Sequence, residues 1–253
     1  MKILLTNDDG IHAPGLGVLE TIARDISDDI WVVAPEIEQS GKSRAVTLTE
    51  PLRTRELGKR KWSVTGTPTD CVLMALEKFL ESPPDLILSG VNRGQNMGED
   101  TSFSGTVAAA LCGMQHGVRS IALSQAMNFR QDGSIPWETA EAWGTKVLKP
   151  LLEKGWPEDA IMNINFPDRT PEDVEGIQIT RQGFRDHTQL RMEERRDLRG
   201  NAYSWIGYSG RLSDPADGTD LRAIYDGYIS ISPLQIDLTH NEYLNTLRSE
   251  WES

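Results

Sequence analysis

Short apolar runs alternate with segments of helical periodicity along the first 168 residues. The apolar runs are rich in Ile, Leu and Val and cover residues 1–6, 30–34, 86–88, 121–123 and 161–164, with weaker strand patterns at 46–48 and 63–64. Apolar residues recur every three or four positions in residues 15–26, 69–80, 104–116 and 137–152. Such alternation is typical of a parallel sheet with helices on both faces. We therefore predict a doubly wound, three-layer α/β/α core, Rossmann-like and mostly parallel, over residues 1–168.

The pattern changes after Asp168. Arg, Gly and Tyr become common, and long polar segments separate strand-like stretches at 177–180, 203–206 and 228–232. Long loops in a compact protein usually cover a site or contact another subunit. We predict that residues 169–253 form β-hairpin extensions of the main sheet that take part in oligomerisation, and that they are not an independent domain.

The composition narrows the classes of function. The formal net charge of −12 works against binding to nucleic acid polymers or to an acidic membrane surface. No stretch approaches the roughly 18 consecutive apolar residues of a membrane span, and the first residues do not resemble a signal peptide, so we expect a cytoplasmic protein. Cys71 and Cys112 lie in helical patterns without a Cys-x-x-Cys spacing, which predicts buried, reduced thiols. The four histidines do not cluster, which argues against a zinc site.

An acidic pair follows the first strand. Ligands of open α/β sheets bind at the carboxyl ends of the strands, where Asp8 and Asp9 stand. Gly10 permits a turn that would let these neighbouring side chains converge. Two carboxylates would repel each other and a phosphate unless they held a hard cation such as Mg²⁺ or Mn²⁺. The position favours a metal site over a simple Asx-type turn.

Two later strand ends carry polar groups that could join this site. Ser40, next to Gly41, could bring a hydroxyl to the same ion, although a Ser-Gly pair alone indicates only a loop. In the glycine-rich loop at 89–103, Asn92 could offer an amide oxygen to a metal. Arg93 and Asn96 could donate to phosphate oxygens.

The central helix begins at Ser104-Gly105-Thr106. The free N–H groups and the dipole at a helix N-terminus favour an anion, so this turn is a candidate phosphate site. Ser104 is also a normal N-cap residue, and the two roles are compatible.

These residues belong to motifs that resemble the SurE (survival protein E) family of metal-dependent 5′-nucleotidases. The motifs are KILLTNDDGIHAPG at 2–15, APEIEQSG at 34–41, GTPTDC at 66–71, SGVNRGQNMGEDTSFSGTV at 89–107, NINFP at 163–167, RGNAYSW at 199–205 and GYISISPLQ at 227–235. The resemblance covers residues 1 to about 239, and the first and fourth motifs are highly specific. It implies one divalent ion, Mg²⁺ or Mn²⁺, per subunit, held by Asp8, Asp9, Ser40 and Asn92. It places Asn96 and the turn Ser104, Gly105 and Thr106 at the phosphate.

The resemblance also implies a reaction. Asp8 and Asp9 would be catalytic in the hydrolysis of nucleoside 5′-monophosphates, and some members also accept 3′-monophosphates or short polyphosphate. It implies a homodimer or homotetramer. Phe103 stands where the family usually has Tyr, and Leu111-Cys112 replaces a Glu-Gly pair, from which we expect a packing change only.

Two other classes share part of the pattern. A dinucleotide-binding dehydrogenase would need Gly-x-Gly where this chain has its acidic pair, and Gly15-Leu16-Gly17 comes too late. A non-enzymatic receiver domain also has an acidic pair and binds Mg²⁺. Its phospho-acceptor Asp should end a middle strand, but here Leu88 is followed by Ser89 and Gly90. The chain is also about twice the size of such a module.

Overall fold

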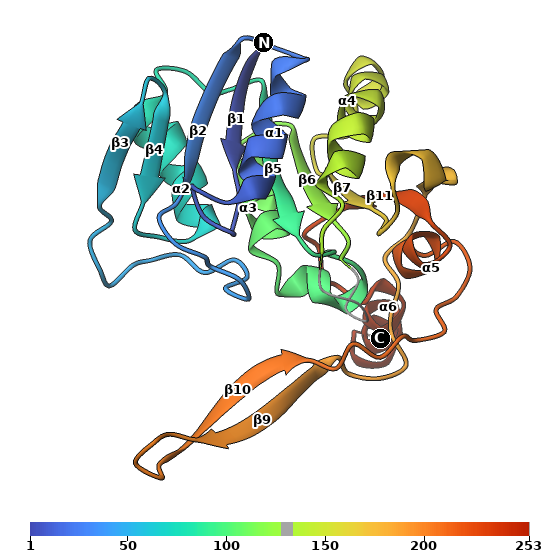
Figure 1. The fold of residues 1–253 in the computed structure, drawn as a ribbon. Coiled ribbons are helices and arrows are strands. Elements are labelled where there is room, and N and C mark those ends of the chain that lie inside the picture. The colour runs from blue at the N-terminus through green and yellow to red at the C-terminus, as the bar shows by residue number, and fades with distance from the viewer. Residues whose placement is uncertain (128–133, 253) are drawn as a thin grey trace.

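The computed structural model describes residues 1–127 and 134–252, and within them a nine-stranded sheet lies between two layers of helices (Figure 1). In spatial order the strands are β3 (Thr54–Gly58), β4 (Lys61–Val64), β2 (Asp29–Pro35), β1 (Lys2–Thr6), β5 (Leu86–Arg93), β6 (Ser120–Gln125), β7 (Ile161–Phe166), β11 (Tyr228–Leu234) and β8 (Gly176–Ile179). Neighbouring strands are parallel except in the pairs β3–β4 and β7–β11. The predicted mostly parallel α/β fold is confirmed.

Helices cover both faces of this sheet. Helices α1 (Pro14–Arg24) and α4 (Trp137–Lys154) pack together on one face, and α2 (Pro68–Met74) and α3 (Gly105–Gln115) pack together on the other (Figure 1). A π-helical turn at Ala75–Phe79 continues α2. Helix α3 is buried on nearly every side, as its apolar sequence predicts. None of the helices that the structure describes is both long and apolar enough to cross a membrane.

Both cysteines lie in the core between α2, α3 and the sheet. Cys71 and Cys112 are free and buried, as predicted, and belong to one apolar cluster with Leu4, Val33 and Ile87. Burial raises the pKa of Cys112 to about 11 and holds that of Cys71 well above its usual value.

The strand order positions the site. Along the chain the sheet grows from β1 to β2 on one side and then from β1 to β5, β6 and β7 on the other. This reversal leaves a crevice at the carboxyl ends of β1 and β5, which is where ligands bind in open α/β sheets. Between β5 and α3 the chain forms a 3₁₀ turn at Gly98–Ser102.

The C-terminal third extends the fold in two ways. Strands β8 and β11 join the main sheet, with a 3₁₀ turn at Pro171–Asp173 before β8 and α5 (Asp220–Tyr225) packed against β11. Strands β9 (Leu190–Arg196) and β10 (Ala202–Tyr208) instead form their own antiparallel hairpin, which projects from the body (Figure 1). Helix α6 (Asn241–Trp251) buries none of its residues.

Several elements depart from the predictions. The strand expected at 46–48 is wrong, because this segment is an exposed loop in which Leu48 is 87% accessible. Strand β3, strand β9 and helices α5 and α6 were not predicted. Strand β5 continues to Arg93, so Asn92 lies in a strand and not in the loop.

Candidate active site

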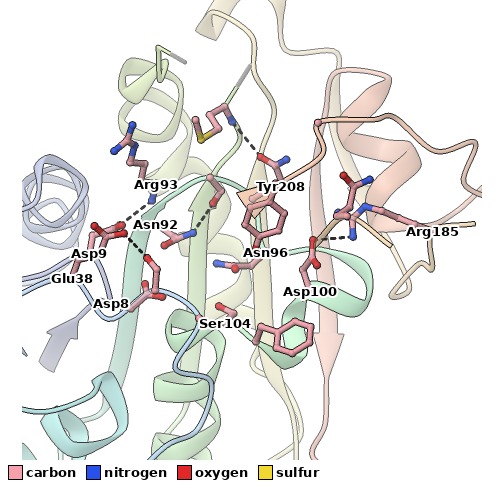
Figure 2. Close-up of a pocket in the computed structure, with 18 of the residues that line it drawn as sticks. Asp8, Asp9, Glu38, Asn92, Arg93, Asn96, Asp100, Ser104, Arg185 and Tyr208 are labelled. Carbon is pink, nitrogen blue, oxygen red and sulfur yellow. Dashed lines mark hydrogen bonds and ion pairs between the residues drawn. The ribbon is translucent and has the colours of Figure 1, made fainter. Parts of the chain in front are cut away.

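A tight turn at the end of β1 brings the two acidic side chains together. The side-chain amide of Asn7 donates to the Gly10 carbonyl at 2.9 Å and accepts from the Gly10 N–H at 3.3 Å. Gly10 has a φ of +102°, which only glycine adopts readily. Asp8 and Asp9 both line the same pocket and lie next to each other there (Figure 2).

The N-terminus of α3 holds Asp8. The Thr106 hydroxyl donates to the Asp8 carboxylate, and backbone hydrogen bonds from Gly105 and Thr106 also stabilise it. Burial is the largest effect and raises the pKa of Asp8, whereas these hydrogen bonds oppose the increase. Gly105 is required for this contact, because a Cβ there would lie 2.9 Å from the Asp8 Cβ and 3.0 Å from the Pro68 Cγ.

Asp9 has a different environment. It accepts one hydrogen bond, at 2.9 Å, from the backbone N–H of Arg93 at the end of β5. Burial, followed by the negative charge of Asp8, raises the pKa of Asp9 to about 7. Asp9 can therefore hold or release a proton near neutral pH, and a bound cation would favour its charged form.

The other two predicted metal ligands line the same pocket. The loop after β2 is tied to the end of β1 by a 2.7 Å hydrogen bond from the Gln39 N–H to the Asp8 carbonyl. In this loop Ser40 donates its hydroxyl proton to Glu38 at 2.8 Å. The amide nitrogen of Asn92 donates to the Gly94 carbonyl at 2.7 Å, which leaves its amide oxygen as the atom suited to a cation.

The residues predicted at the phosphate divide into two pairs. Asn96 and Ser104 line the pocket, and the Ser104 hydroxyl also caps α3 by accepting from the Val107 N–H at 3.1 Å. Gly105 is buried, Thr106 is fully buried, and neither is in the pocket wall. Their direct role at a phosphate stays a prediction.

The outer wall of the pocket comes mainly from the C-terminal third. The cavity measures about 330 Å³, and its rim includes Phe103, Gln189, Tyr208, Arg211 and Leu212. Tyr208, at the end of β10, lies over the pocket next to Asn96 (Figure 2). Of these five residues only Phe103 belongs to a motif singled out in the sequence, because no local pattern shows that the base of a hairpin folds back onto the sheet edge.

Arg185 connects this outer wall to the 3₁₀ turn at Gly98–Ser102. Its side chain is 5% exposed and forms ion pairs of 2.9 Å with both Glu99 and Asp100. Asp220 strengthens the same junction by accepting from the Gly98 N–H at 2.9 Å and from the Gly183 N–H at 2.8 Å. The turn that leads into α3 is therefore held by residues from the C-terminal third.

The fold and the site together define a mostly parallel α/β protein with an acidic pair in a pocket at the sheet's switch point. The family model described as "Survival protein SurE" matches residues 3–189. The chain belongs to the SurE family.

Relatives and a solved structure agree with this assignment. The chain is 64% identical over the full length of both chains to a protein from Hyphomonas neptunium named "5′-nucleotidase SurE". It is 58% identical to a protein of the same name from Caulobacter vibrioides, over 98% of this chain and 95% of that one. The crystal structure of the SurE protein from Aquifex aeolicus superposes with a TM-score of 0.83 at 35% identity, covering 98% of this chain and 99% of that one.

Proposed function

We propose that this chain is a divalent-metal-dependent phosphomonoesterase that hydrolyses nucleoside 5′-monophosphates to nucleoside and phosphate. Family membership and the names of relatives that are 64% and 58% identical support a 5′-nucleotidase. The observation that carries the proposal is one pocket that combines Asp8, Asp9 and Asn92 with Asn96 and Ser104. Its volume of about 330 Å³ lies within the range of small-molecule sites and would accommodate a nucleotide.

The donor set fits one Mg²⁺ or Mn²⁺ ion. Within the described residues no three His, Cys, Asp or Glu side chains lie close enough together to hold a metal ion. The proposed site instead combines two carboxylates with two neutral oxygens. Asp8, Asp9, Ser40 and Asn92 would supply these hard oxygen ligands, which such ions prefer. The raised pKa values of Asp8 and Asp9 support the assignment, because a cation would offset the cost of two buried negative charges. When bound, the ion would polarise the phosphoryl group.

The two aspartates would have different tasks. Asp8 is fixed by Thr106 and the start of α3, so it would serve mainly as a ligand. Among the described residues Asp9 accepts a hydrogen bond from the Arg93 backbone and is not held by a side-chain donor as Asp8 is, so it would orient the attacking water or protonate the leaving ribose oxygen. A covalent aspartyl-phosphate is an alternative route, and trapping a phosphorylated Asp9 would distinguish it.

The phosphate would lie between Asn96 and the start of α3. Asn96 and Ser104 face the pocket and would donate to the equatorial oxygens as charge develops in the transition state. Gly105 and Thr106 would contribute by orienting Asp8.

The C-terminal third would form the contact between subunits of a homodimer or homotetramer. On one face of the hairpin, Met192 and Ile206 form a cross-strand pair and are 71% and 69% exposed. An isolated two-stranded hairpin is marginally stable in water, so a second copy of the chain would cover this face. The acidic net charge argues against nucleic acid polymers and membranes as partners. Arg185 lines the pocket, whereas Arg191, Arg195 and Arg196 lie on the projecting hairpin.

The test is phosphate release from a panel of substrates. Nucleoside 5′-monophosphates, 3′-monophosphates and short polyphosphate would each be assayed with Mn²⁺ or Mg²⁺, then with EDTA, then with metal restored. We expect release from 5′-monophosphates that EDTA abolishes and metal restores. Release that is insensitive to EDTA, or no release from any nucleotide with either metal, would contradict the proposal.

A further inference from the structure

The backbone of Asn96 is held by two buried side chains of β7. The Asn96 N–H donates to the Asn165 side-chain oxygen at 2.8 Å, and the Asn165 amide nitrogen donates back to the Asn96 carbonyl at 3.1 Å. The Asn163 amide nitrogen donates to the same carbonyl at 2.9 Å. Asn163 and Asn165 are both 0% exposed. Together they form what we name the asparagine clamp.

The side chain of Asn96 is fixed from the neighbouring strand. Its amide nitrogen donates to the Ser124 hydroxyl at 2.9 Å, and Ser124 on β6 is the register partner of Asn165 on β7. The loop after β5 thus crosses the ends of β6 and β7 and is bonded to both. Asn96 is 8% exposed, and both its backbone and its side chain form hydrogen bonds to these strands.

Burying the two amides of the clamp costs free energy that filling the core alone would not require. Buried amides cost free energy unless both their donor and acceptor are used, and apolar side chains would fill the same space without that cost. Within the described residues the amide oxygen of Asn163 has no hydrogen-bond partner. The buried amide of Asn163 is therefore used for one bond, to the Asn96 carbonyl.

The next strand offers a comparison. Ser230 on β11 is the register partner of Asn165 and is also 0% exposed. Its hydroxyl bonds to Thr180 at 2.7 Å, remote from the pocket. Of these three register neighbours, Ser124 and Asn165 bond to Asn96 of the pocket wall, whereas Ser230 bonds to Thr180.

We propose that Asn163 and Asn165 are positioning residues that set the side chain of Asn96 for phosphate binding. This inference rests on the proposed function, because it requires Asn96 to contact the phosphate. Neither clamp residue lines the pocket, so neither touches substrate. They act by fixing the Asn96 backbone, from which its side chain extends between Ser124 and the pocket.

The test compares Asn165→Leu, Asn165→Asp and the matched control Ser230→Ala. Asn165→Leu removes both bonds to Asn96, and Asn165→Asp keeps the acceptor but loses the donor. We expect kcat to fall by about 10²-fold in Asn165→Leu, because misplacement of a contact by about 1 Å has that effect. Asn165→Asp should be intermediate, and Ser230→Ala should match the wild type. Inhibition by inorganic phosphate should weaken in the same order, while the Mn²⁺ concentration for half-maximal activity stays constant.

Two readouts separate positioning from a general loss of structure. Hydrogen exchange at the Asn96 amide should accelerate in Asn165→Leu, whereas exchange at the amides of β1 should stay at the rate of the control. Wild-type kcat and phosphate inhibition in Asn165→Leu would overturn the inference and leave the proposed function intact. Equal losses of kcat, Mn²⁺ response and melting temperature in both Asn165 variants would also overturn it. An inactive wild type would contradict the proposed function, and unchanged exchange at Asn96 would still reject the clamp.

Discussion

The carboxyl edge of the sheet and the projecting hairpin differ in how far their side chains are buried and hydrogen-bonded. At the sheet edge, Asp8, Asn92 and Asn96 are at most 8% exposed, and their side chains bond to α3, to the loop after β5 and to β6, respectively. In the hairpin nearly every residue is exposed, and large apolar side chains such as Trp205 face solvent. The first region is fixed by its own chain, whereas the second has the surface of an element that needs a partner. Variants should therefore affect activity in the first region and assembly in the second.

The largest effect should come from Asp9→Asn at the sheet edge. Losing its proton transfer should lower kcat by about 10²- to 10⁴-fold. The variant should fold normally, because the substitution removes a buried charge beside Asp8 and keeps the side-chain shape. Phosphate release and thermal unfolding would be measured together. Near-normal turnover would reject Asp9 as a catalytic residue.

The same charge pair should make the metal-free protein less stable as pH rises. The folded-state pKa of Asp9 is raised from 3.8 to about 7, so between these values the folded state binds more protons than the unfolded state. The free energy of unfolding should therefore fall from pH 4 to pH 7 by about 2 to 4 kcal/mol and stay low above pH 7. Urea unfolding with EDTA at several pH values would show this, with Asp9→Asn having a shallower slope. A wild-type slope equal to that of Asp9→Asn would contradict it.

Substitutions in the hairpin should change the mass of the assembly in solution and leave the stability of the core unchanged. Ile206→Lys places a charge on the exposed apolar face beside Met192, and it should weaken self-association by about 2 kcal/mol or more. Leu48→Lys makes the same apolar-to-lysine change at an exposed residue outside the hairpin and is the matched control. Light scattering over a dilution series would compare the two. Equal dissociation constants, or a monomeric wild type, would contradict an interface on this face.

A pair of glycines gives the smallest expected effects. Gly105→Ala should destabilise the protein by about 1 to 3 kcal/mol, because the new Cβ would press against Asp8 and Pro68. Gly17→Ala lies on the exposed side of α1 with no atom within 4 Å of the new Cβ, so it should stabilise by about 0.5 to 1 kcal/mol. Thermal unfolding would measure both. A stabilised Gly105→Ala would show that α3 is not tightly packed on Asp8.

The two regions also differ in how far the sequence predicts them. Buried strands β1 and β5 contain continuous apolar runs, and the ends of those runs mark where Asp8 and Asn92 should converge, as the structure finds. Strand-end positions alone therefore predict Asp8, Asp9 and Asn92 near one another, whereas Ser40 enters the proposed ligand set only through the resemblance to the SurE family. What they bind stays a prediction.

The other elements lack that signal because little of their surface is buried. Strand β9 has the sequence LRMEERR, strand β3 is an exposed edge, and α6 has no buried residue. Periodicity reports burial, so such elements leave no clear pattern. The contribution of Tyr208 to the pocket depends on how the hairpin base folds back, which no local pattern encodes.

The two buried thiols provide a probe of slow local opening in the core. Cys71 and Cys112 both lie under the layer formed by α2 and α3, and α3 begins against Asp8. A thiol reagent can reach them only while that layer is open, so the labelling rate of native protein measures how often it opens. In the closed state burial raises the pKa of both thiols and keeps them protonated, so labelling would come from the open state.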